Sequence, residues 1–250
     1  MKNNILKKAI AVSALALSFN VFAGGCSNAN LAAWTDVRDD TGTRVNVVAP
    51  GLDASACTAT FEASSSNADR ARVQDRTPAC ETSYRAAFLF NVDSLGTLAS
   101  NERTKFFNAQ CNANDGDTCG RVGQFQFRLQ GDGANNNILR SFVIDESVPN
   151  ADARRKFDIP VSSGVNTLEI QWIQASSPVA TDGVWRVWIN NSTEASPDIE
   201  YTDVQNGESC IGQVGLGLIQ ATNAFVASKA DTPFSIDTFE SRRQTGITVQ

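Results

Sequence analysis

Histidine is absent from this 250-residue chain. A Ser-His-Asp triad and a Cys-His nucleophile pair both need an imidazole base, so both arrangements are excluded. The six cysteines show no Cys-x-x-Cys spacing, and without that spacing or histidine the chain lacks the usual ligands of a structural zinc site. Acyl transfer by an activated serine or cysteine and folding around zinc are therefore not expected of this sequence.

Long apolar runs are also missing, since no segment beyond the N-terminal region approaches 18 apolar residues, the length of a membrane-spanning helix. Residues 1–23 have the pattern of an export signal: lysines precede a short apolar run that ends in Val21-Phe22-Ala23. We therefore expect a secreted protein, extracellular or periplasmic. Lipid anchoring through Cys26 is disfavoured, because Ala23 stands where an acylated cysteine would need a large aliphatic residue.

Basic residues are scarce after this signal. Removal of residues 1–23 takes away three lysines and no acid, which leaves 18 basic and 27 acidic residues and a formal charge of −9. An acidic chain of this kind disfavours nucleic acid and anionic membranes as partners. No linker, repeat or shift of composition divides the remainder, so we expect residues 24–250 to form a single domain.

All six cysteines lie after the signal, and an even number in an exported chain predicts three disulfides. Cys111 and Cys119 bracket a very polar loop, which predicts a local bridge between them. Cys57 and Cys80 flank a segment that we interpret as a hairpin, so we expect these two to pair. The remaining pair is then Cys26 with Cys210, which would tie down the N-terminal segment.

The stretch from Asn166 to Asn191 contains three of the four tryptophans and predicts two strands joined by a turn. In its first arm, Trp172 and other apolar residues alternate with polar ones, which is the period of a half-buried strand. Asp182-Gly183 supplies a turn. The second arm, with Trp185 and Trp188 on opposite faces, is apolar on both sides, as a strand within a two-layer structure would be.

Alternation or β-branched and aromatic enrichment marks strands along nearly the whole chain, and no window predicts a helix longer than a turn or two. Besides the two arms, the expected strands are Arg44–Val48, Cys57–Ala63, Arg70–Gln74, Tyr84–Val92, Thr104–Asn108, Arg121–Leu129, Ile138–Ile144, Lys156–Ile159, Ile199–Val204, Gly212–Ile219 and Pro233–Phe239. So many short strands with polar turns predict an all-β sandwich or jelly roll.

Four segments carry a family resemblance: RVQDRTPACETSYRAAFLFNVDSL, LEIQWIQAS with ATDGVWRVWINN, GQVGLGLI and PFSIDTFESRRQT. Together they resemble the concanavalin A-like lectin/glucanase superfamily, and within it the laminin G-like domains of secreted bacterial proteins, over Val48 to Thr245. The resemblance implies a concanavalin A-like jelly-roll sandwich of two antiparallel sheets, and the three expected disulfides would brace it. It implies little about activity, because this fold serves lectins, adhesins, glycanases, lyases and structural modules.

Residues for catalysis are few. The Glu-x-Asp-x-x-Glu spacing of a retaining glycanase on this fold is absent. Asp198 and Glu200 share a strand face, but such pairs usually belong to a solvated surface. A polysaccharide lyase would want a Tyr or His base beside Arg or Lys, and Tyr84 and Tyr201 are the only tyrosines. Tyr84 shares a face with phenylalanines, so we interpret it as a core residue.

Calcium is the one metal for which the sequence offers ligands. Asn112, Asn114, Asp115 and Asp117 supply oxygen atoms within one short loop. The loop lacks the EF-hand pattern, and a solvated loop between Cys111 and Cys119 explains it as well. We therefore expect no cofactor and keep calcium as the alternative.

Carbohydrate binding is the function that the residues favour. A sugar site combines an aromatic ring with planar hydrogen-bonding side chains. If Gln124, Gln126 and Arg128 face a concave sheet, and Arg186 with Trp188 projects from the neighbouring strand, these ingredients meet. We therefore predict a secreted, non-catalytic module that binds a glycan or another cell-surface ligand. The alternatives are a polysaccharide-active hydrolase or lyase, and a structural or adhesive protein without a small ligand.

Overall fold

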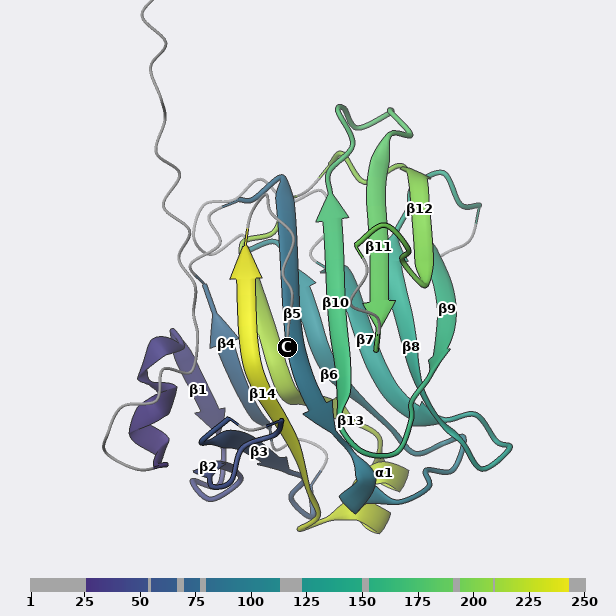
Figure 1. The fold of residues 1–250 in the computed structure, drawn as a ribbon. Coiled ribbons are helices and arrows are strands. Elements are labelled where there is room, and N and C mark those ends of the chain that lie inside the picture. The colour runs from purple at the N-terminus through teal and green to yellow at the C-terminus, as the bar shows by residue number, and fades with distance from the viewer. Residues whose placement is uncertain are drawn as a thin grey trace, which may run out of the picture.

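Two antiparallel β-sheets of seven strands each stack face to face (Figure 1). The computed structural model describes residues 26–53, 55–66, 70–76, 80–112, 123–149, 153–190, 194–208 and 210–242. The predicted all-β jelly-roll sandwich is therefore confirmed.

Sheet A, the rear sheet in Figure 1, has the strand order β1-β4-β13-β6-β7-β8-β9. Its strands are β1 (Asp36–Asp39), β4 (Ala71–Asp75), β6 (Arg103–Gln110), β7 (Gly123–Gly131), β8 (Asn137–Ile144), β9 (Arg154–Pro160) and β13 (Gln213–Ala221). Sheet B, in front, has the order β12-β11-β10-β5-β14-β3-β2. Its strands are β2 (Val45–Val48), β3 (Thr58–Glu62), β5 (Ser83–Asn91), β10 (Asn166–Ile173), β11 (Gly183–Ile189), β12 (Ile199–Val204) and β14 (Pro233–Arg242).

The predicted strands correspond to β2 through β14. The prediction missed β1, because its sequence DVRD is polar and charged and therefore shows no apolar alternation. Within the described part of the chain, three short helical segments accompany the strands: η1 (Asn28–Ala33), η2 (Asp93–Leu95) and α1 (Asn223–Lys229). The hydroxyl of Thr222 caps α1 by accepting a hydrogen bond from the backbone N–H of Phe225.

Alternation of buried and partly exposed residues explains why the sheets pack. Along β10 every second residue is buried, and Trp172 has no exposed surface. The inward residues of both sheets form one hydrophobic core. The ring centroids of Phe107 in sheet A and Phe88 in sheet B lie 5.3 Å apart. Those of Phe125 in sheet A and Trp185 in sheet B lie 4.7 Å apart. Burial of these rings supplies the main driving force for folding.

Two of the predicted disulfides are wrong. The structure pairs Cys26 with Cys57, and Cys80 with Cys210. Cys57 and Cys80 do not flank a hairpin, because β3 lies in sheet B whereas β4 lies in sheet A. Cys111 is also disulfide-bonded, and its predicted partner Cys119 lies outside the described residues.

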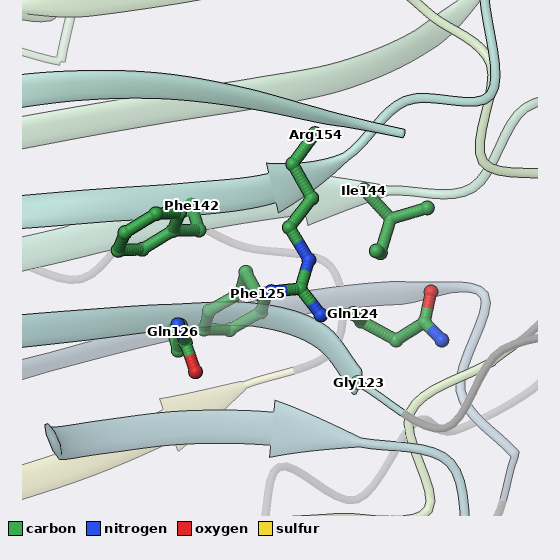
Figure 2. Close-up of a pocket in the computed structure, with 7 residues that line it drawn as sticks. All are labelled: Gly123, Gln124, Phe125, Gln126, Phe142, Ile144 and Arg154. Atoms are coloured by element: carbon green, nitrogen blue, oxygen red, sulfur yellow. The ribbon is translucent and has the colours of Figure 1, made fainter. Parts of the chain in front are cut away.

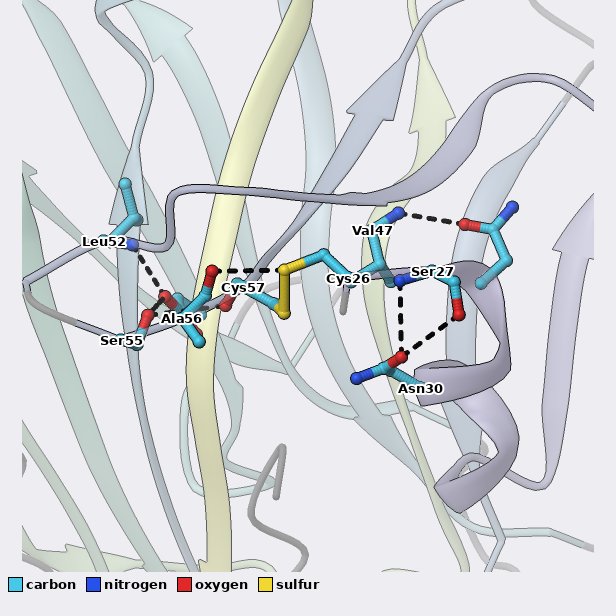
Figure 3. Close-up of a disulfide and its surroundings, with 10 residues drawn as sticks. Cys26, Ser27, Asn30, Val47, Leu52, Ser55, Ala56 and Cys57 are labelled. Atoms are coloured by element: carbon cyan, nitrogen blue, oxygen red, sulfur yellow. Dashed lines mark hydrogen bonds between the residues drawn. A yellow bond between two sulfur atoms is a disulfide. The ribbon is translucent and has the colours of Figure 1, made fainter. Parts of the chain in front are cut away.

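The two bridges act at different places. Cys26–Cys57 fastens the N-terminal segment to the residue that precedes β3 (Figure 3). The side chain of Asn28 also accepts a hydrogen bond from the N–H of Val47 on β2, at 2.9 Å. Cys80–Cys210 joins the segments that lead into β5 of sheet B and β13 of sheet A. Beside it, Glu81 and Ile211 exchange two backbone hydrogen bonds. This bridge therefore couples the two sheets.

The predicted export signal, residues 1–23, lies outside the described residues. The sulfur of Cys26 is bonded to Cys57, so it is not free to carry a lipid thioether. Within the described ranges, none of the helices has the length and apolar character needed to cross a bilayer.

Removal of Cys80–Cys210 is expected to cost more stability than removal of Cys26–Cys57. The sequence separations are 130 and 31 residues, and loop-closure entropy gives roughly 5 and 4 kcal/mol respectively. Chemical denaturation of Cys80→Ala/Cys210→Ala and Cys26→Ala/Cys57→Ala, each compared with the wild type, measures both losses. A larger loss for the second variant would contradict the inter-sheet role of Cys80–Cys210.

Candidate functional site

The outer face of sheet A carries the polar residues that the sequence singled out on β7. Phe125, Phe127 and Leu129 point into the core, as predicted. Gln124, Gln126 and Arg128 alternate with them and point to the opposite side of the sheet, where Gln126 and Arg128 are partly exposed and Gln124 is buried, with 1% of its surface exposed. The structure therefore confirms the predicted orientation of this strand.

Cations from three neighbouring strands stand directly opposite one another on this face. Lys105 of β6 is the register partner of Arg128 on β7, and Arg128 is the partner of Arg140 on β8. Arg140 in turn faces Asp158 of β9 and donates two hydrogen bonds to its carboxylate, at 2.6 and 2.7 Å. Like charges opposite each other destabilise a sheet. We call Lys105, Arg128 and Arg140 the cation row.

A second row lies beside the first. Across β6, β7, β8 and β9 it contains Asn108, Gln126, Phe142 and Lys156. The guanidinium of Arg128 lies 4.6 Å from the centroid of the Phe142 ring, and the Lys156 ammonium lies 5.8 Å from the same centroid. Because an aromatic face attracts cations, Phe142 supports two positive groups on the outside of the sheet.

Two recesses flank this pair of rows. The first has an empty volume of ≈ 200 Å³ and lies over β7, β8 and the start of β9 (Figure 2). Its lining residues are Gly123, Gln124, Phe125, Gln126, Phe142, Ile144 and Arg154. The second has an empty volume of ≈ 380 Å³ and is lined by Arg103, Lys105, Arg128, Gln220, Ala221 and Thr222. Gln126 thus lines the first recess, and Arg128 lines the second together with two further cations.

Lys105 has the electrostatics of a proton acceptor. Its burial lowers the pKa of its ammonium, and the charges of Arg128, Arg154, Arg72 and Arg70 lower that pKa further. Among the described residues, the ammonium group of Lys105 has no hydrogen-bond or ion-pair partner. An amine that is partly desolvated among cations loses its proton more readily than a free lysine does.

Gln126 has an unsatisfied donor on the same face. Its side-chain Nε2 is buried and lacks a hydrogen-bond acceptor among the described residues. A buried donor without an acceptor costs free energy, which a ligand oxygen would recover. Together, Gln126 and the cation row form a surface suited to carboxylate groups.

Arg186 and Trp188 do not join this site, so the prediction that they project beside β7 is wrong. They belong to β11, which lies in sheet B. Arg186 donates hydrogen bonds to Glu200 at 2.5 Å and to Gln171 at 2.8 Å. Trp188 is 2% exposed and is covered by the guanidinium of Arg85, 4.6 Å from the ring centroid. Periodicity along a strand does not reveal which sheet that strand joins.

The predicted calcium loop is only partly described. Asn112 is buried, and Asn114, Asp115 and Asp117 lie outside the described residues. In the ranges that the structure does cover, no three Cys, Asp or Glu side chains gather as a metal site would require.

Neither tyrosine faces the cation row. Tyr84 is buried in the core, as predicted, where burial and then the charge of Asp75 raise the pKa of its hydroxyl. The guanidinium carbon of Arg155 lies 4.7 Å from the centroid of the Tyr201 ring in sheet B. Sequence reasoning missed Lys105, although a lysine flanked by buried residues in the strand RTKFFNAQ was the available signal.

No protein-family profile and no curated protein sequence matches this chain. Solved structures do match. An endo-β-1,4-glucuronan lyase from the fungus Trichoderma reesei has a TM-score of 0.62 at 16% identity, covering 86% of this chain and 92% of that one. The alginate lyase Aly36B, in complex with an alginate trisaccharide, has a TM-score of 0.64 at 12% identity, covering 93% and 99%.

A third match is an immunostimulatory antigen and pseudo β-1,3-glucanase of Mycobacterium tuberculosis, with a TM-score of 0.53, 11% identity and coverage of 84% and 87%. These neighbours are two polysaccharide lyases and a glucanase-like protein, and their fold is consistent with the resemblance to the concanavalin A-like superfamily. They correct our prediction of a non-catalytic module: structures that cover nearly the whole chain are polysaccharide lyases, which favours the alternative of a polysaccharide-active enzyme.

Replacement of Trp188 by alanine is expected to lower the free energy of unfolding by about 3–5 kcal/mol, because the side chain is buried beneath Arg85. Trp188→Phe, which keeps an aromatic ring, should lose less. Chemical denaturation measures both losses. A fully stable Trp188→Ala variant would contradict a packing role for this residue.

Proposed function

We propose that this protein is a polysaccharide lyase that binds an acidic, uronate-containing polymer across the outer face of sheet A and cleaves it by β-elimination. The observation that carries the proposal is the cation row, in which Lys105 lies directly opposite Arg128. The lyase neighbours support the choice of reaction, since the fold of this chain accommodates that chemistry in them.

The substrate carboxylate is bound by Arg128, whose planar guanidinium matches a carboxylate in shape and charge. The Nε2 donor of Gln126 lies on the same face and strand and adds a hydrogen bond. Neutralisation of the carboxylate makes the hydrogen on the adjacent sugar carbon more acidic, because the negative charge that develops after its removal is stabilised by the same groups.

Lys105 is the general base in this proposal. Its neutral amine removes the hydrogen from the carbon next to the carboxylate, and the electron pair of that C–H bond forms a C=C bond as the glycosidic C–O bond breaks. The ammonium that results then passes the proton to the departing glycosidic oxygen. The products are an oligosaccharide with an unsaturated end and one with a new hydroxyl, so water is not consumed.

Hydrolysis fits this face less well. A glycoside hydrolase needs two carboxyl groups about 5–9.5 Å apart. The outward carboxylates of the described sheet A strands are Asp36 on β1 and Asp158 on β9, at opposite edges of the sheet. Asp158 is also engaged with Arg140. Elimination by an amine needs no such pair.

The proposed setting is outside the cytoplasm. Disulfides are typical of oxidising compartments, and polymeric glycans are extracellular substrates. An export signal at residues 1–23 and one catalytic domain at 24–250 complete this proposal. The finer assignment to the laminin G-like domains also remains part of the proposal, without support from the structural neighbours.

Lys105→Arg is expected to retain polymer binding and lose cleavage, because an arginine keeps the positive charge but does not lose its proton near neutral pH. Ultraviolet absorbance of the unsaturated product measures cleavage of β-1,4-glucuronan and alginate, and calorimetry measures binding. Lys156→Arg on the same face is the matched control and should remain active. Full activity of Lys105→Arg would refute the assignment of the base.

The cleavage rate of the wild type should rise with pH and level off below 10.5, the ordinary pKa of lysine. The neutral amine is the active form, and burial together with Arg128 and the other arginines lowers the pKa of Lys105, so that form appears at lower pH than in a free lysine. A pH profile of kcat/KM checks this expectation. A value of kcat/KM that falls as the pH is raised above 7 would contradict it.

A further inference from the structure

Arg72 extends the positive surface beyond the cation row. It lies on β4 between Ala71 and Val73, both of which are buried in the core, so its own side chain points outward. Its register partners are Arg38 on β1 and Gly217 on β13. The sheet order places β13 alone between β4 and β6, the strand of Lys105.

Arg72 has no acidic partner among the described residues. The nearby acids are engaged elsewhere: Asp40 accepts a hydrogen bond from Arg38 at 3.0 Å, and Asp36 lies 4.0 Å from Arg76. The Nε of Arg72 is buried and lacks an acceptor. Burial lowers the pKa of Arg72, the charges of Arg70 and Arg38 add to that effect, and the charge of Asp36 only partly opposes it. An oxyanion at this position would accept the hydrogen bond that the Arg72 Nε–H lacks, and it would reduce the repulsion between the neighbouring arginines.

The spacing between Arg72 and Lys105 suits a polymer. Strands in a sheet lie about 4.8 Å apart, so β4 and β6 lie roughly 10 Å apart. Arg72 stands opposite Gly217 and Lys105 opposite Gln220, so the two residues are also offset along the strands, and they are separated by at least the length of a disaccharide unit. Between them, Gly215 of β13 stands opposite Gln74 and Asn108. A Cβ at Gly215 would come within 2.7 Å of the Asn108 Oδ1, so the Asn108 side chain occupies the space that the missing side chain leaves. A polymer that crosses β13 at this position therefore meets the amide of Asn108.

We propose that Arg72 binds the carboxylate of a second uronate, at least two sugar residues away from the one that Arg128 and Lys105 engage. This inference rests on the proposed function, and it adds a direction and a length to the substrate. The polymer crosses the strands from β8 toward β4, and oligomers long enough to reach Arg72 bind more tightly than shorter ones.

The test compares oligomer length with the loss caused by Arg72→Gln. Calorimetry is performed with oligoglucuronates and alginate oligomers of two to six residues, in the Lys105→Arg background so that no cleavage occurs. Arg72→Gln should weaken binding of the four- to six-residue oligomers about tenfold, the equivalent of one charge-assisted hydrogen bond, and leave the dimer unchanged. Arg72→Lys should recover part of the loss.

Arg186→Gln is the matched control, because it removes the same charge from the outer face of sheet B and should alter no affinity. Thermal unfolding shows whether Arg72→Gln is folded, and Arg72→Lys supplies the comparison if it is not. An equal loss at every length, or no loss at all, would overturn the role of Arg72 while leaving intact a wild type that cleaves uronate polymers. A wild type that binds no uronate oligomer would overturn both proposals.

Discussion

The burial of aromatic rings between the two sheets is the constraint on which the rest of the structure depends. Phe107 shows how it works: its ring lies within 6.3 Å of Phe88, Phe125, Phe127 and Phe239, which come from both sheets. Because side chains alternate along a strand, fixing these rings inward fixes their neighbours outward. Because the outward residues of sheet A lie on the same strands as these rings, the hydrophobic core also fixes their orientation and register.

The cations on the two outer faces of the sandwich have different neighbours. On sheet B, Arg85 donates hydrogen bonds to Glu169 and Glu194, and Arg186 donates to Glu200. On sheet A, opposed cations on β6 and β7 accumulate beside amide side chains. A net acidic chain therefore carries one locally basic face. Ion-paired arginines are typical of structural surfaces, whereas cations held directly opposite one another are typical of a site for an anionic ligand.

The absence of histidine and the scarcity of tyrosine led sequence reasoning away from catalysis, and the lysine on β6 shows why. The pKa of a lysine amine depends on its burial and on the charges around it. Lys105 owes its lowered pKa to burial and to arginines on other strands. These neighbours are distant in sequence, so the composition of the chain does not disclose them.

From the sequence alone, strand positions and the outward orientation of Gln124, Gln126 and Arg128 were determined, since both follow from alternation between neighbouring residues. Only the tertiary structure decided which sheet each strand joins, which cysteines pair, that Trp188 is buried, and that Lys105 faces Arg128. The physical reason is range: alternation acts within a few residues of one strand, whereas sheet order and register depend on how distant strands pack around a shared core.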